Sequence, residues 1–68
     1  MRHSVVIEKA GSGHSGYVPD LPGCVAEGSR VAKVKRELAA AIPFHLDGLR
    51  AGGEPVTLPE SAVEWVEV

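Results

Sequence analysis

Short apolar runs separated by glycine and proline occupy the first part of the chain, a pattern that predicts strands joined by tight turns. Residues 1–10 form the first predicted strand, and its contiguous β-branched residues 5–7 indicate a strand that is covered on both faces. A second strand is predicted to begin at Tyr17, after a flexible hairpin connection over residues 11–16. A third, short strand is predicted over residues 24–27.

The connection between the second and third strands is dense in proline and glycine. Proline fixes φ and pushes the residue before it toward extended conformations, so Val18 and Leu21, which precede prolines, are predicted to be extended. Gly23 can adopt positive φ without steric cost, which suits the exit of a turn. The segment is therefore predicted to be a rigid corner between two antiparallel strands.

The apolar positions of residues 30–51 recur at helical spacing and predict one amphipathic helix. Ser29 is the expected N-cap, and two consecutive glycines at residues 52–53 are the expected stop. The apolar positions are Val31, Val34, Leu38, Ile42, His45 or Leu46, and Leu49. After the helix, two prolines hold a loop extended, and residues 62–68 are predicted to form a last strand.

Two neighbouring residues do not fit the buried face of this helix. Pro43 costs about 3 kcal/mol inside a helix unless it falls at a bend. A helical wheel places Pro43 and Phe44 on the solvent side. Either the bend changes the phase of the helix, or Phe44 belongs to an interface.

These elements predict a single α+β domain over residues 1–68, in the order strand, strand, strand, helix, strand. Three strands form an antiparallel sheet, one helix packs on one face, and a right-handed connection lays the last strand parallel to the first. Val5 and Ile7 are expected to point to one face and Val6 to the other. Because one helix covers only one face, the second face is expected to be buried by another copy, in a homodimer or a higher homo-oligomer.

Composition narrows the classes of partner. The chain has 68 residues and a formal net charge of −2, so no overall positive field draws it to nucleic acid or anionic membrane, and a neutral or basic partner is expected. No apolar run is long enough for a membrane span. A single cysteine and the absence of an apolar leader predict a cytoplasmic protein.

Motifs for catalysis and cofactor binding are weak. Residues 11–16 match G-x-G-x-x-G, but the prolines that follow prevent the helix that a dinucleotide fingerprint requires, so no nucleotide cofactor is expected. Ser12, His14 and Ser15 are neighbours on a loop that supplies no fixed geometry for hydrolysis. The cysteine and histidines match no metal-ligand spacing. The sequence predicts no metal and no enzyme activity.

A basic cluster marks the start of the helix, where the macrodipole makes positive charge mildly unfavourable. These side chains could contact phosphates, which makes weak nucleic-acid binding the alternative function; equally, they could form a solvated face balanced by nearby glutamates. The cluster consists of Arg30, Lys33, Lys35 and Arg36.

Several segments together resemble the HicB-like antitoxin family across nearly the whole chain. They are YVPDLPGCVAEG at residues 17–28, AIPFHLDGLR at residues 41–50, GEPV at residues 53–56 and the closing VEV at residues 66–68. The resemblance implies a partial ribonuclease H-like fold and a non-catalytic protein. It further implies that the partner is HicA, a small basic ribonuclease toxin that cuts messenger RNA.

The chain departs from this family in three respects. It carries no DNA-binding segment after Val68, so autorepression is not expected, and its first helical turn lacks the acidic residues common in the family. Glu8 and Asp20 do not make the multi-carboxylate, two-metal site of active ribonuclease H enzymes. The expected contacts with a toxin are an exposed corner at Asp20 and Leu21, together with Phe44 if it faces outward. Asp20 could equally have a structural role in the turn.

Overall fold

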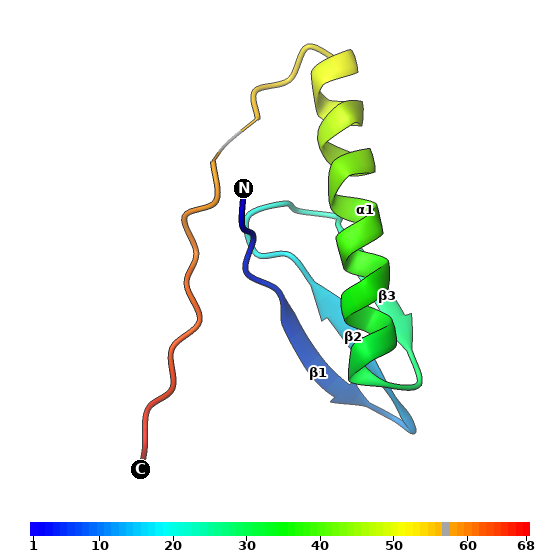
Figure 1. Ribbon diagram of the computed structural model, residues 1–68, viewed down its shortest axis with the longest axis vertical. Helices are drawn as coiled ribbons and strands as arrows, with labels where there is room; N and C mark the ends of the chain where they lie inside the picture. The colour runs from blue at the N-terminus through cyan, green and yellow to red at the C-terminus, as the bar shows by residue number, and fades with distance from the viewer. Residues whose placement is uncertain (57) are drawn as a thin grey trace.

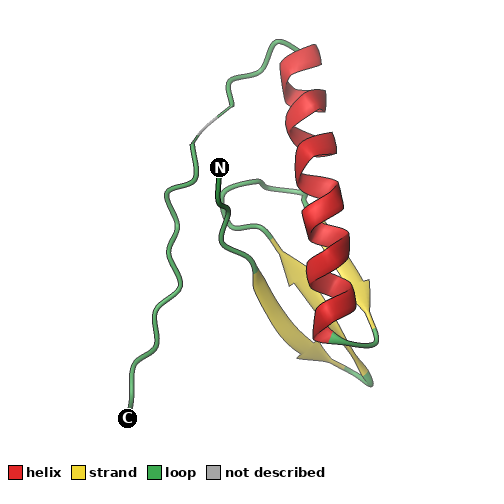
Figure 2. Ribbon diagram, viewed as in Figure 1, coloured by secondary structure: helices red, strands yellow, loops and turns green. Residues whose placement is uncertain are grey.

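The computed structural model describes residues 1–56 and 58–68. Its elements follow in the order β1 (Val6–Ala10), β2 (Gly13–Tyr17), β3 (Val25–Gly28) and α1 (Val31–Ala51). The strands form an antiparallel sheet in the order β1-β2-β3, and α1 lies across one face of it (Figures 1 and 2). The predicted α+β class, the three antiparallel strands and the single helix are confirmed.

The predicted last strand is wrong. Within the described part of the chain no fourth strand pairs with the sheet, and residues 58–68 run as an extended segment beside it (Figure 1). The segment touches the body of the protein where Ser61 bonds to Asp20, and its later residues run clear of the sheet (Figure 1). Residues 62–68 have the valines and the tryptophan typical of a strand, but a strand also requires a pairing partner, which composition does not specify.

The register of the sheet assigns each side chain to a face. Ile7 pairs with Gly16, which in turn pairs with Ala26, and this row lies under α1. The adjacent row joins Val6, Tyr17 and Val25, and because successive side chains alternate, it points away from the helix. Val5 and Ile7 pack against the core under α1, as predicted, and Val6 belongs to the opposite face.

The hairpin between β1 and β2 is tighter than the sequence predicted. Gly11 has φ +59°, which matches the first central residue of a two-residue type II′ turn, and β2 already begins at Gly13. His14 and Ser15 are therefore strand residues and not part of a flexible loop.

The corner between β2 and β3 consists of two consecutive turns. The amide of Leu21 donates to the carbonyl of Val18 at 3.0 Å, and the amide of Cys24 donates to the carbonyl of Leu21 at 3.1 Å. Pro22 and Gly23, with φ +87° at the glycine, fit the central positions of a type II turn. A third bond, from the Val18 amide to the Cys24 carbonyl at 3.1 Å, closes the loop. The predicted rigid corner is confirmed.

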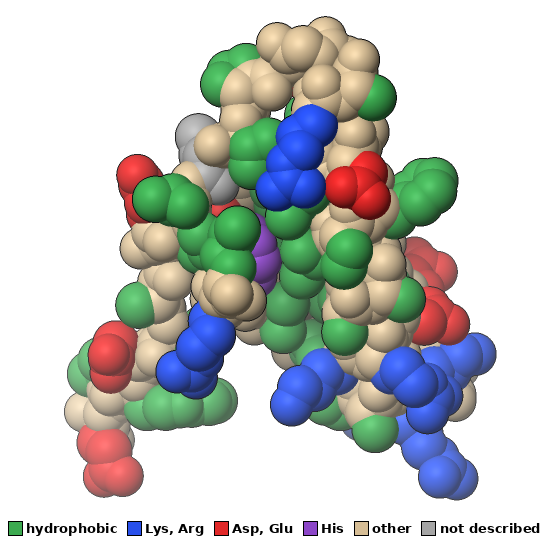
Figure 3. Space-filling view, turned by 45° about the horizontal axis from the view of Figure 1, so that its top comes forward, with side chains coloured by type: hydrophobic (Ala, Val, Ile, Leu, Met, Phe, Trp, Pro, Cys, Tyr) green, Lys and Arg blue, Asp and Glu red, His purple; other side chains and the backbone are tan. Residues whose placement is uncertain are grey.

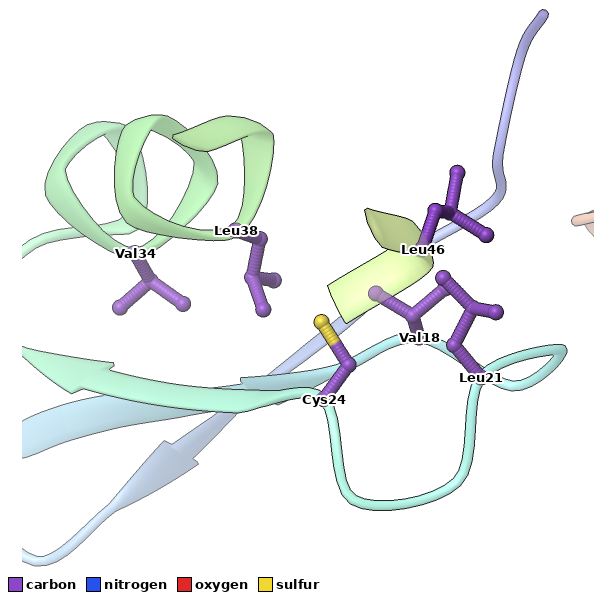
Figure 4. Packing of buried hydrophobic residues seen from close by; sticks show 6 residues of the cluster. All are labelled: Val18, Leu21, Cys24, Val34, Leu38 and Leu46. Atoms are coloured by element: carbon purple, nitrogen blue, oxygen red, sulfur yellow. The ribbon is translucent and has the colours of Figure 1, made fainter. Parts of the chain in front are cut away.

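The hydrophobic core lies between α1, the sheet and this corner (Figure 4). Val34 and Leu38 sit over the sheet, whereas Leu46 reaches the corner, one helical turn beyond Pro43. Each fully buried aliphatic side chain stabilises the fold by about 1.5–3 kcal/mol. The buried residues are Val18, Leu21, Cys24, Val34, Leu38 and Leu46.

The helix begins one residue later than predicted, at Val31. Arg30 occupies the N-cap position in an extended conformation without a side-chain capping bond, so the expected Ser29 cap is wrong. Pro43 lies on the exposed side of α1. Proline has no backbone N–H, and the helical hydrogen bond lost at this position disturbs no buried contact. No helix in the described residues combines the length and apolarity needed to cross a membrane.

Candidate protein-interaction surfaces

The face of the sheet turned away from α1 carries the most conspicuous surface pattern, and we call it the outer sheet face. Two rows cross all three strands. The first row is apolar and consists of Val6, Tyr17 and Val25. The second row consists of Glu8, Ser15 and Glu27 and carries two carboxylates. Tyr17 is 43% and Val25 66% exposed, so the apolar row is open to solvent over β2 and β3.

The two carboxylates of this face lie on β1 and β3, with Ser15 of β2 between them. Two strand spacings of about 4.8 Å separate them, which limits their mutual repulsion while both contribute negative potential. Within the described strands this face presents no lysine or arginine. An exposed apolar row that includes one tyrosine, beside like charges, is suited to a protein partner with an apolar centre and basic residues next to it.

The three residues predicted from the sequence as toxin contacts do not form one exposed surface in the structure. Leu21 is only 2% exposed and belongs to the core, so the expectation that it lies at an exposed corner is wrong. The corner closes through backbone bonds on both sides of Leu21, and this turns its side chain inward against Val18 and Leu46. Phe44 is 83% exposed on α1, which confirms the outward placement, but it lies on a different element from the corner.

Asp20 holds a segment that is distant in the sequence. Its carboxylate accepts hydrogen bonds from the Ser61 amide, at 3.2 Å to each oxygen, and from the Ser61 hydroxyl at 3.0 Å. Desolvation raises the pKa of Asp20, but the bonds from Ser61 and the Glu60 backbone, together with nearby His3, lower it, and the net pKa lies below its ordinary value. The structure thus gives Asp20 a structural contact; its role toward a partner stays a prediction.

The basic cluster forms a separate surface at the start of α1. Arg30, Lys33, Lys35 and Arg36 are all exposed, and Figure 3 shows lysine and arginine side chains gathered at this end of the molecule. No acidic residue occupies the first turn of the helix. Among the described residues the salt bridge that forms lies elsewhere, between Arg50 and Asp47 at 3.3 Å. Within the described residues, the four cationic side chains of the cluster thus face solvent.

Histidine and cysteine side chains are dispersed. His14 Nδ1 lies 3.3 Å from the Ser29 carbonyl oxygen, to which it donates when protonated at that nitrogen. His45 is half-buried near Gly23, and burial raises the pKa of the Cys24 thiol. In the parts of the chain described, no three metal-ligating side chains come together.

Sequence reasoning assigned Val6 correctly but did not assemble the outer sheet face. The signal was present as alternation, since Val6 and Glu8 are two residues apart, as are Val25 and Glu27. Only the cross-strand register shows that these pairs meet through Tyr17 and Ser15.

Comparison with known proteins gives two similarities. No family model matches the chain. An uncharacterized 14.9 kDa protein in the rep–hol intergenic region of Haemophilus phage HP1 is 34% identical over 61 residues, which cover 90% of this chain and 44% of that protein. The chain thus spans less than half the length of this relative.

The structural similarity is to a chain in the HicA3 and HicB3 toxin-antitoxin complex. The TM-score is 0.72 and the sequence identity 28%, over 87% of this chain and 70% of that chain. The protein therefore has a fold found in a toxin-antitoxin complex.

Proposed function

We propose that this protein is a HicB-like antitoxin module that binds a small, basic HicA-type ribonuclease toxin and blocks it without catalysis. The observation that carries the proposal is the 0.72 TM-score to a chain of a toxin-antitoxin complex. The segment resemblance to HicB-like proteins at residues 17–28 supports the antitoxin as the component that this chain corresponds to. The proposed activity is cytoplasmic, where the messenger RNA substrate of such a toxin is found.

The outer sheet face is the proposed contact. Tyr17 and Val25 supply apolar surface that is already exposed, and Glu8 and Glu27 add negative charge in the next row, on one side of it. Tyrosine is enriched at protein interfaces, and complementary charge steers association and excludes partners of like charge. A basic toxin is better matched to this acidic surface than to the basic cluster of α1, which would repel it.

Binding alone is the proposed mechanism of inhibition. Phosphodiester cleavage by two metal ions needs several convergent carboxylates. Here Glu8 points from the outer sheet face, whereas the Asp20 carboxylate accepts bonds from Ser61 at the corner. These two acids serve different surfaces, which supports a protein that covers a toxin rather than one that cleaves RNA.

The test uses the small basic protein encoded by the adjacent gene. That protein, purified alone, is expected to cleave messenger RNA, and an equimolar amount of this chain is expected to suppress cleavage. The variant Glu8→Lys/Glu27→Lys should lose most of the suppression, because it reverses the charge of the outer sheet face. A matched variant, Glu37→Lys/Glu54→Lys, changes the net charge equally at exposed positions elsewhere and should suppress cleavage normally.

Three results would contradict the proposal: no small basic protein encoded next door, no complex between the two proteins, or equal loss of suppression in both variants. The predicted homodimer through the outer sheet face competes for the same residues, Tyr17 and Val25. Self-association that is lost on Val25→Lys while toxin binding persists would assign this face to a second copy.

Weak nucleic-acid binding is the second candidate, supported by the four exposed cations of the basic cluster. Affinity for RNA that falls steeply with salt and vanishes on charge reversal of Arg30, Lys33, Lys35 and Arg36 would favour it. Retention of a basic protein partner that survives charge reversal of these four residues would favour the antitoxin function.

A further inference from the structure

The C-terminal tail, residues 61–68, is extended, and every residue in it is exposed. Trp65 is 92% and Val66 83% exposed, and Val63 is more than half exposed. Figure 1 shows the tail descending beside β1 in the same general direction, and Figure 3 shows it standing off from the body of the molecule. Water-exposed tryptophan and valine in a strand-like segment indicate a surface that lacks its partner.

The sheet has a matching open edge. β1 is hydrogen-bonded to β2 on one side, and in the described structure no strand pairs with its other side. An unpaired edge is a template for a further strand, and α1 covers β2 and β3 more than it covers β1. The chain therefore has an unpaired strand edge, at β1, and an extended segment able to pair with such an edge, the tail.

The tail does not close onto its own edge in this structure. The bonds from Ser61 to Asp20 fix the start of the tail at the corner between β2 and β3. An open hollow lined by residues 2–4 and 61–63 separates the tail from the segment that enters β1. Beyond the hollow the tail diverges from the segment that enters β1 (Figure 1).

We propose that two copies of this chain exchange their C-terminal tails, so that each tail becomes a strand beside β1 of the other copy. The start of the tail is held at the corner by Ser61, but the residues beyond it stand clear of their own body (Figure 1), which leaves them open to such an exchange. The exchange satisfies both open edges and brings Trp65 and the tail valines against a second sheet. It extends the sheet sideways, so the outer sheet face stays available to the proposed toxin.

The test combines sedimentation velocity with the fluorescence of Trp65, the only tryptophan. From low to high micromolar concentration, the protein should sediment increasingly as a dimer while the Trp65 emission shifts to shorter wavelength. The variant Val66→Pro/Glu67→Pro removes consecutive amide donors, which point to opposite sides of a strand, and should raise the dimer dissociation constant by about tenfold or more. Both positions are fully solvated in the protomer, so its circular dichroism should not change.

The matched control is Val25→Lys, on the outer sheet face. It should leave the dimer intact, whereas a dimer that is lost on Val25→Lys and kept in the proline variant would overturn strand exchange. Sedimentation as a monomer at every concentration would also overturn it. So would Trp65 emission at short wavelength in a protein that sediments as a monomer. Toxin suppression by the monomeric proline variant is measured separately, so the exchange and the antitoxin function can fail independently.

Discussion

Gly16 in β2, the central strand of the sheet, allows α1 to approach the sheet, and Gly16→Ala tests this packing directly. A Cβ at this position would lie 2.7 Å from Val34 Cγ1, 3.0 Å from Leu38 Cδ1 and 3.2 Å from the Val6 carbonyl oxygen. Real Cβ atoms essentially never approach a heavy atom closer than 3.0 Å, so the helix or its side chains must shift. Overpacking of this kind costs about 1–3 kcal/mol.

Part of this cost is offset, because alanine restricts the unfolded chain more than glycine does, by about 0.4–1 kcal/mol. We therefore expect Gly16→Ala to lower the free energy of unfolding by about 1–2 kcal/mol. A domain of this length is stable by only about 3–10 kcal/mol in total, so the loss is easily measured. The assay is urea unfolding followed by circular dichroism, at one fixed protein concentration.

Gly48→Ala is the matched control, because it makes the same substitution inside α1 where no heavy atom lies within 4 Å of the new Cβ. Alanine is favoured over glycine in a helix by about 0.8–1 kcal/mol, so this variant should be more stable than the native protein. If Gly16→Ala were as stable as the native protein, the close approach of α1 to β2 would be refuted.

The described contacts and exposures give four other predictions. Cys24 is buried with a raised pKa, so a thiol reagent at neutral pH should modify it only as fast as the protein opens, and rapidly in urea. Asp20→Asn should increase hydrogen exchange at the Ser61 amide, because an uncharged side chain accepts these bonds more weakly. Since the pKa of Asp20 is lowered in the folded protein, its contact should persist at neutral pH and be lost as pH falls below about 4, which proteolysis of the tail by an acid-active protease would detect. Phe44→Ser should leave the free energy of unfolding within about 0.5 kcal/mol, since the ring is exposed; a loss of toxin binding in this variant would place Phe44 in an interface.

The sequence predicted those parts of the fold that are determined locally. The prolines and Gly23 predicted the corner because they restrict or permit particular backbone angles wherever they stand. The helical spacing identified Val34 and Leu38 as core residues, and the structure resolves the open choice at the next turn in favour of Leu46, which is buried while His45 is only half-buried.

Features that depend on contacts between residues far apart in the sequence could not be predicted from local patterns. Leu21 neighbours the polar Asp20 and was expected outside, but the closure of two turns directs it into the core. The tail has the composition of a strand, yet strand formation depends on which edge it meets. The outer sheet face also depends on register, because a shift of one residue would exchange its side chains with those under α1.

The central claim, that the outer sheet face binds a basic toxin, is tested most directly by calorimetric titration of the adjacent gene's product into two valine variants. Val25→Lys places a cation in the apolar row and should weaken binding by about tenfold or more. Val31→Lys makes the same change at another exposed valine, at the start of α1, and should keep the native affinity. Native affinity in Val25→Lys, or equal weakening in both variants, would contradict the account.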